Sequence, residues 1–190
     1  IKENKPQIYE KARYFCEATA FFTGYLTGKP VNGYCGSSYT QLLNVQTKTW
    51  SDTIFEAAGL EQSKMFEVRN AFDVAGTVLK KRAEEFGLST DTKVVVGDSD
   101  HEIAMLGSGM SKPGMVLDIS GTSTSIATYT EKPVYDPAGT MLTHLSANGK
   151  YWNLENASLI TGGNLRWYKD TIARCGYSEM DKAAISIAPG

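Results

Sequence analysis

Apolar residues recur at steps of three and four along two stretches of this 190-residue chain, and that spacing predicts helices. The first stripe runs from Ile8 to Leu26 and ends before Gly28 and Pro30, two residue types that terminate helices. The second stripe lies within residues 75–86. Its members are Ala75, Leu79, Arg82, Ala83 and Phe86.

Runs of β-branched residues predict strands in the rest of the chain. The stretch "KVVVG" at residues 93–97 is typical of a buried strand. Further on, "MVLDIS" and "TSIATYT" predict a hairpin joined by "GTS", and "GKYWNLENASLI" predicts another strand. Between these two groups lies "GSGMSKPG", from Gly107 to Gly114, which has no apolar period. We therefore expect two domain parts, residues 1–110 and residues 111–190.

The predicted strand breaks at "GDSD", and helical spacing resumes at about His101. Open α/β sheets place their chemistry in such turns, at the carboxyl end of a strand. We expect Asp100 to cap the helix, where the helix dipole stabilises a carboxylate. There it could orient a substrate hydroxyl and accept its proton, although a plain N-cap is the commoner role for an Asp at this position. Asp98 faces the other side of an extended chain, so we expect it to be structural.

Two glycine-containing segments could bind phosphate. The turn Gly121-Thr122-Ser123 offers backbone N–H groups and hydroxyls that can surround phosphate oxygens. In "TGGNLRW", Gly162 and Gly163 open a predicted helix and would let a phosphate approach its N–H groups. An ordinary hairpin and a tightly packed helix entry explain the same segments without any ligand.

Composition narrows the classes of partner. The net charge of −2 gives no basic surface, so we expect no nucleic-acid partner. No apolar stretch is long enough to suggest a membrane span. Cys16, Cys35 and Cys175 are too sparse for a disulfide scaffold and favour a reducing, cytoplasmic location. His101 and His144 have no partners at metal-ligand spacing, so we expect no zinc site.

In their order along the chain, these segments resemble the FGGY family of carbohydrate kinases. "TGKPVNGYCGSSYTQLLNVQTKTWSDTIFEAAGL" is similar to the family's polar loop and the "hydrophobic-D/N-hydrophobic-x-T-x-x-W" element after its "YL-x-x-x-L-T-G" helix. "VVVGDSDHEIAMLGSGM" resembles the element in which the catalytic Asp precedes a Gly by seven residues, a spacing that Asp100 and Gly107 share. "LDISGTSTSIA" and "TGGNLRWYKD" resemble its phosphate loop and its "G-G-x-x-x-x-W" element. The resemblance covers essentially the whole chain.

The resemblance implies an α/β, actin-like ATPase (ribonuclease H-like) fold, of which this chain is a fragment spanning parts of two domains. Residues 1–110 would be the C-terminal part of the sugar-binding domain, and residues 111–190 the N-terminal part of the nucleotide-binding domain. The implied reaction transfers the γ-phosphoryl group of ATP, with Mg²⁺, to a sugar or polyol hydroxyl, nominally in a xylulokinase. Asp100 would be the base, acting mainly by positioning.

The family also implies binding roles for other residues. They are Tyr34 and His101 for the substrate, and Gly121, Thr122, Ser123, Gly162 and Gly163 for the ATP phosphates. The expected partner is therefore a small sugar or polyol, with a homodimer left open.

Two departures from the family keep the substrate open among pentuloses, hexonates and polyols. Many pentulose kinases carry an Asp in the loop that here reads "NGYCGSS", and His101 stands where several relatives have an amide side chain. Two alternatives to a sugar kinase also remain. One is an actin-like nucleotide-binding sensor. The other is a non-catalytic fragment: Ile1 and the final "SIAPG" do not resemble natural termini, and half of the phosphate clamp that the family implies is absent from these residues.

Overall fold

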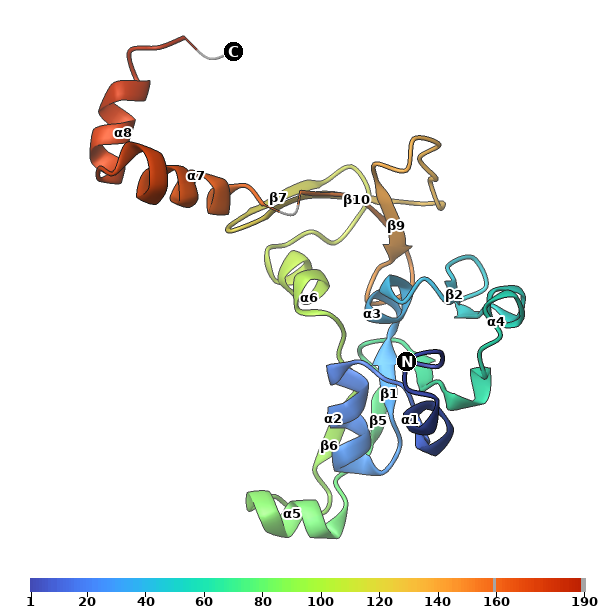
Figure 1. The fold of residues 1–190 in the computed structure, drawn as a ribbon. Helices are drawn as coiled ribbons and strands as arrows, with labels where there is room; N and C mark the ends of the chain where they lie inside the picture. The colour runs from blue at the N-terminus through green and yellow to red at the C-terminus, as the bar shows by residue number, and fades with distance from the viewer. Residues whose placement is uncertain (159, 189–190) are drawn as a thin grey trace.

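The computed structural model describes residues 1–158 and 160–188 (Figure 1). In the first half of the chain the elements are α1 (Pro6–Lys11), α2 (Ala18–Thr27), β1 (Val31–Gly33), α3 (Tyr34–Tyr39), β2 (Leu43–Asn44), β3 (Thr49–Trp50), α4 (Asp52–Ala58), η1 (Gln62–Lys64), β4 (Glu67–Arg69), β5 (Val74–Thr77), α5 (Lys80–Phe86) and β6 (Lys93–Val95). They continue with α6 (Asp100–Gly107), β7 (Val116–Ser120), β8 (Thr124–Thr130), β9 (Leu142–Leu145), β10 (Trp152–Ser158), α7 (Gly162–Tyr168), η2 (Lys169–Ala173) and α8 (Tyr177–Ala184).

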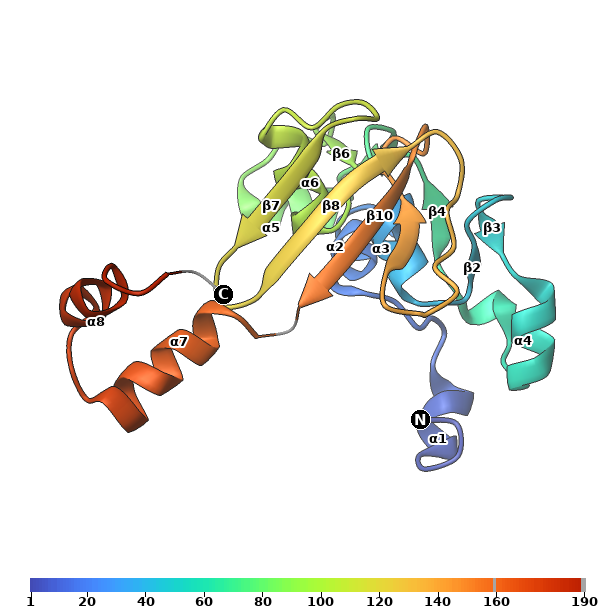
Figure 2. The same ribbon diagram turned by 90° about the horizontal axis from the view of Figure 1, so that it is seen from above.

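The second half of the chain builds an antiparallel sheet with the strand order β7-β8-β10-β9 (Figure 2). Strands β7 and β8 form the hairpin predicted from the sequence, with Ser120 paired to Thr124 beside the turn. Strand β10 pairs with β8 along its whole length, so that Ser158 lies opposite Thr124. The turn of the hairpin and the last residues of β10 therefore lie at the same end of the sheet.

Helix α6 is held against this sheet by a small core. Met105 on α6 and Met110 just after it pack with Ala127 and Tyr129 of β8, and all four side chains are buried. Helices α3 and α6 lie between the sheet and the group formed by α2, β1, β5 and β6 (Figure 1). The first residues of α6 are thereby fixed near the end of the sheet that carries the hairpin turn.

The first half is built around short strands and helix α2. Strand β1 pairs in parallel with β4, β5 pairs antiparallel with β6, and β2 pairs antiparallel with β3. The buried hydroxyl of Thr23 on α2 donates to the carbonyl of Val31 at 2.7 Å and accepts from its N–H at 2.9 Å. A small buried apolar cluster in this half consists of Val31, Ala75 and Val96. Within the described residues, no helix is long and apolar enough to cross a bilayer.

Two of the predicted helices were wrong in part. The stripe from Ile8 to Leu26 is two helices, because Phe15 leaves the helical path to donate its N–H to the Lys64 carbonyl at 2.8 Å. The ring of Phe15 stacks on Tyr9, with 5.1 Å between their centroids, so its apolar surface is buried without a continuous helix.

The second stripe, within residues 75–86, begins as strand β5 rather than as a helix, and α5 starts only at Lys80. Pairing with β6 supplies the backbone hydrogen bonds of residues 74–77. The predicted strand at residues 93–97 is confirmed over β6 but is only partly buried: Val96 is 1% exposed and Val95 is 53% exposed.

Replacement of Met105 with Ala should destabilise the protein by about 2–5 kcal/mol, because it opens a cavity between α6 and the sheet. Ile103→Ala is the matched control, since Ile103 lies on the same helix but is 40% exposed. Urea unfolding of both variants measures the difference, and equal losses would contradict the assignment of Met105 to this core.

Candidate active site

Asp98 joins the end of β6 to the start of α3. Its Oδ2 accepts a hydrogen bond from the N–H of Cys35 at 3.0 Å, and its Oδ1 accepts one from Gly36 at 2.7 Å. The N–H of Ser99 also donates to Oδ1, at 2.9 Å. Burial raises the pKa of Asp98, and these backbone N–H groups oppose the rise. The carboxylate is 8% exposed and has the structural position expected of it.

Two glycines make room for this carboxylate. A Cβ on Gly33 would lie 2.2 Å from Oδ2 of Asp98, which is far inside contact distance. A Cβ on Gly36 would lie 2.9 Å from Oε2 of Glu17 and 3.3 Å from Oδ1 of Asp98. The loop can therefore close over Asp98 because its backbone carries no side chains at these two positions.

Asp100 begins helix α6 but does not cap it, so the predicted N-cap was wrong by one residue. Ser99 is the cap: its backbone is extended, and its Oγ accepts from the N–H of Glu102 at 3.4 Å. Asp100 is exposed, and its Oδ1 accepts from the N–H of His101 at 2.8 Å. Because Ser99 performs the capping, the carboxylate of Asp100 can interact with a ligand.

Asp100 and His101 share a recess of about 410 Å³ with Ala104 and Ile119. Ile119 belongs to β7 and lies just before the predicted phosphate turn at residues 121–123. The recess thus places the acidic start of α6 beside the strand that leads into that turn.

The structure brings the two predicted phosphate-binding segments together. The carbonyl of Thr122 accepts hydrogen bonds from the N–H groups of Thr161 at 2.9 Å and Gly163 at 3.0 Å. A Cβ on Gly162 would lie 2.3 Å from the carbonyl oxygen of Gly121, so the backbone of the turn and the start of α7 are in direct contact. The turn residues, Ser123 included, are exposed; the N–H of Gly121 donates to the carbonyl of Ser123 at 2.7 Å, whereas the hydroxyls of Thr122 and Ser123 face solvent.

Tyr34, the other predicted substrate residue, does not line this recess. It is half-buried on α3, and a Cβ on Gly149 would lie 2.6 Å from its Cε2. The Nζ of Lys48 lies 6.0 Å from the centre of its ring. Tyr34 is therefore packed against the turn between β9 and β10.

The sequence analysis missed Glu155, a buried carboxylate on β10. Its Oε2 accepts hydrogen bonds from the hydroxyl of Tyr39 at 2.8 Å and from Nε2 of His144 at 2.8 Å. Its Oε1 accepts one from Ser125 and lies 3.2 Å from Nε2 of His101. Burial alone would raise the pKa of Glu155, but these donors together hold it well below the ordinary value.

Three zinc-ligand types also meet in space without any signal in sequence spacing. Cys35, Glu102 and His144 place ligand atoms within 4.8 Å of one another. Each already has hydrogen-bond partners, since Sγ of Cys35 lies 3.2 Å from Nδ1 of His144, and Glu102 accepts from Tyr129 and from the N–H of Ala147. These bonds account for the cluster as part of the fold, and the expected absence of a zinc site stays a prediction.

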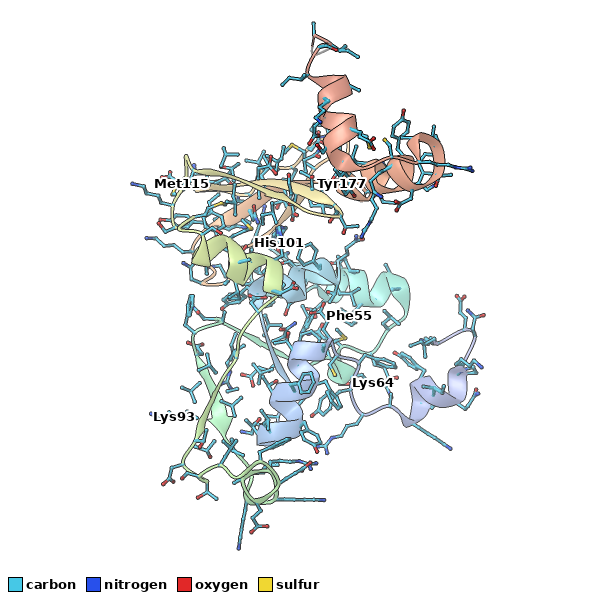
Figure 3. The ribbon with its side chains drawn as sticks, turned by 90° about the vertical axis from the view of Figure 1, so that its left-hand side faces the viewer. Phe55, Lys64, Lys93, His101, Met115 and Tyr177 are labelled. Carbon is cyan, nitrogen blue, oxygen red and sulfur yellow. The ribbon has the colours of Figure 1, made fainter. Side chains whose placement is uncertain are left out.

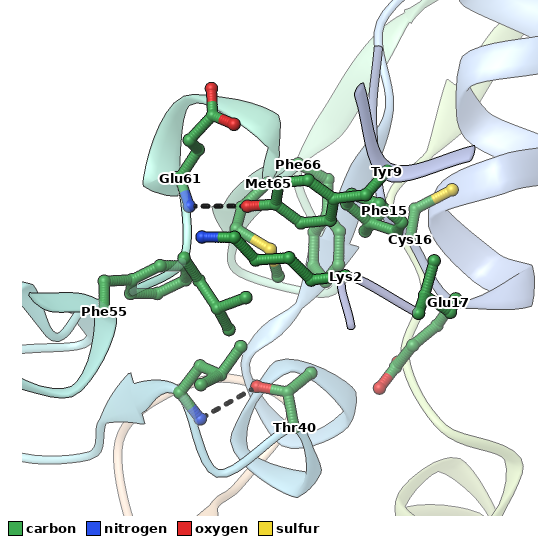
Figure 4. A pocket seen from close by; sticks show the side chains of 13 residues that line it. Lys2, Tyr9, Phe15, Cys16, Glu17, Thr40, Phe55, Glu61, Met65 and Phe66 are labelled. Carbon is green, nitrogen blue, oxygen red and sulfur yellow. Dashed lines mark hydrogen bonds between the residues drawn. The ribbon is translucent and has the colours of Figure 1, made fainter. Parts of the chain in front are cut away.

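A second cavity, of about 310 Å³, is chemically different from the recess (Figure 4). Its lining is mostly aromatic and aliphatic, with Tyr9, Phe15, Phe55 and Phe66 on its walls. Neither Asp100 nor the two predicted phosphate-binding segments line it. Of these two cavities, the recess is the one that contains a predicted catalytic residue, Asp100, and a predicted substrate residue, His101.

Comparison with known proteins assigns the family. Residues 1–107 match the model described as "FGGY family of carbohydrate kinases, N-terminal domain". The chain belongs to the FGGY family. This match covers more than half of the 190 residues and ends at the last residue of α6.

Individual FGGY relatives are similar along most of the chain. A xylulose kinase of Lactococcus lactis is 25% identical over 192 residues, which cover 100% of this chain and 38% of that protein. An autoinducer-2 kinase of Yersinia enterocolitica is 26% identical over 166 residues, with coverage of 87% and 31%. The chain thus spans less than two fifths of the length of these relatives.

The fold is shared with a ligand-bound xylulose kinase from Lactobacillus acidophilus. The two superpose with a TM-score of 0.90 at 20% identity, over 98% of this chain and 38% of the other. The chain therefore has part of the actin-like ATPase fold that the sequence resemblance implied.

Asp98→Asn should destabilise the protein by about 1–3 kcal/mol, because an amide NH₂ cannot accept from every backbone N–H that the carboxylate serves. Asp100→Asn is the matched control: Asp100 is exposed, so its effect on unfolding should stay within about 0.5 kcal/mol. Urea unfolding tests the pair, and a harmless Asp98→Asn would remove the structural role of Asp98.

Gly162→Ala should cost about 1–3 kcal/mol, because its new methyl group would meet the backbone oxygen of Gly121, which cannot move aside like a side-chain end. A Cβ on Gly107 would meet no atom within 4 Å, so Gly107→Ala should change stability little. Thermal or urea unfolding separates the two variants. Equal effects would show that the contact between residues 121 and 162 is looser than described.

Proposed function

We propose that this chain is part of an ATP-dependent kinase that phosphorylates a hydroxyl group of a sugar or polyol. One observation carries the proposal. The carboxylate of Asp100 does not serve as the cap of α6, and it lines a recess together with Ile119. The strand that contains Ile119 leads directly into the exposed turn at residues 121–123. A candidate base and a candidate phosphate site thus lie near the same end of the sheet.

The residues at this end of the sheet are suited to bind the phosphates of ATP. Thr122 and Ser123 offer an exposed backbone and two hydroxyls, the N–H of Gly121 closes the turn onto the carbonyl of Ser123, and Gly162 and Gly163 allow the start of α7 to approach closely. Such groups bind phosphate oxygens without base or sugar specificity. ATP would supply the transferred phosphoryl group, and Mg²⁺ would be its expected counter-ion.

Asp100 would act on the acceptor. Its carboxylate accepts a hydrogen bond from the acceptor hydroxyl, which fixes the direction of the attacking oxygen. As the new O–P bond forms and the bond to the ADP oxygen breaks, the hydroxyl proton passes to Asp100 and ADP leaves. Because the transition state of phosphoryl transfer is loose, positioning contributes more than early proton removal.

The remaining assignments follow the same scheme. Residues 1–110 would contribute to the sugar side and residues 111–190 to the nucleotide side. His101 lines the recess and would contact the acceptor, whereas Tyr34 would need a larger acceptor or a rearranged loop. A xylulose-like ketose is the nominal acceptor, following the Lactococcus lactis and Lactobacillus acidophilus relatives. The unpaired cysteines suit a reducing, cytoplasmic location.

Asp100→Asn in the full-length protein should lower kcat for sugar-dependent ADP release by about 10²–10⁴-fold, because the amide cannot take up the proton. Binding of ATP should change little, since the substitution leaves the turn at residues 121–123 intact. Asp91→Asn, at an exposed turn, is the control.

The substrate panel for this assay should contain pentuloses, hexonates and polyols. Undiminished turnover by Asp100→Asn would remove the proposed role of the base. Nucleotide binding without phosphorylation of any acceptor by the unsubstituted protein would favour a nucleotide-binding sensor instead.

A further inference from the structure

Glu155 is the point at which the sheet meets both helices of the site. Tyr39 comes from α3, His101 from α6, and Ser125 and His144 from the neighbouring strands β8 and β9. Four polar side chains thus surround one carboxylate, and the side chain of Glu155 is only 5% exposed. A buried carboxylate with this many donors is held both in place and in its charged form.

His101 lies on α6 beneath the sheet (Figure 3), where it approaches Glu155 and also lines the recess. Its Nε2 is 3.2 Å from Oε1 of Glu155, and 20% of its side chain remains exposed. Because the same ring lines the recess with Asp100, it contacts the buried carboxylate and still has an edge open to a ligand.

The charges around His101 are negative on both sides. Glu155 faces it from β10, while Asp100 and Glu102 flank it on α6. The close approach of Glu155 at 3.2 Å and the field of these carboxylates raise the pKa of His101 above its ordinary value of 6.5, although burial acts against them. His144 and Tyr39 each hydrogen-bond Oε2 of the same Glu155 carboxylate.

We propose that Glu155 is a positioning residue that holds His101 as an imidazolium at the edge of the recess containing Asp100. An imidazolium carries an N–H on each ring nitrogen, so one can serve Glu155 while the other serves a ligand. That second N–H gives a charge-assisted hydrogen bond to an oxygen of the acceptor or of the transferred phosphoryl group. This use of the recess rests on the proposed function, but the charge and position of His101 do not.

The first test measures the titration of His101 directly. NMR of the full-length protein labelled in histidine follows each imidazole with pH, and the His101→Gln variant identifies its resonance. We expect the midpoint of His101 to lie above 6.5 and to fall by about one pH unit in Glu155→Gln, because an opposite charge is lost.

Tyr39→Phe is the matched control for this titration. It removes a donor to Oε2 of Glu155 and leaves the contact of Oε1 with His101. The midpoint of His101 should therefore stay above 6.5 in this variant. A midpoint at or below 6.5 in the unsubstituted protein would overturn the proposal, even if Glu155→Gln fails to fold.

The second test connects His101 to turnover. Its protonated form is present below the raised pKa and is lost above it, so kcat/KM should fall as the pH rises through the midpoint found by NMR. In Glu155→Gln this fall should begin at a lower pH, in step with the NMR midpoint, whereas a merely structural role would lower kcat/KM equally at every pH.

The two proposals can fail separately. Undiminished turnover by Asp100→Asn contradicts the proposed function and leaves the NMR midpoint of His101 to decide the role of Glu155. If Asp100→Asn lowers turnover as expected but the NMR midpoint of His101 is not above 6.5, only the proposed role of Glu155 is contradicted.

Discussion

The site depends on the capture of the Asp98 carboxylate by the backbone at the start of α3. That contact joins residues 35 and 36 to the end of β6, two segments that are far apart in the sequence. It also fixes the point at which Ser99 can cap α6, and so sets the position of Asp100. A buried carboxylate is costly unless hydrogen bonds compensate for lost water, and here three backbone N–H groups do so.

Between the helices and the sheet, polar groups take the place of a continuous apolar core. Glu102 and Glu155 are both buried, and each accepts hydrogen bonds from more than one element. Such contacts hold only in one geometry, whereas apolar side chains tolerate sliding. The fold thereby fixes the orientation of α3 and α6 relative to the sheet, which is the property that a site shared between these elements requires.

Local signals in the sequence predicted local structure well. The β7–β8 hairpin was correctly placed, because turn chemistry acts over a few residues. The break at Phe15 was not predictable, since it depends on pairing with a segment some fifty residues away. The family resemblance predicted Asp100 as the base and residues 121–123 as a phosphate-binding turn. Glu155 gave no signal, because its partners are spread over four elements that only the tertiary fold brings together.

The close approach of Gly33 to Asp98 also constrains how this sequence can have diverged from its relatives. Any residue with a Cβ at position 33 would collide with the carboxylate at position 98, so the two positions cannot both carry a full side chain in this geometry.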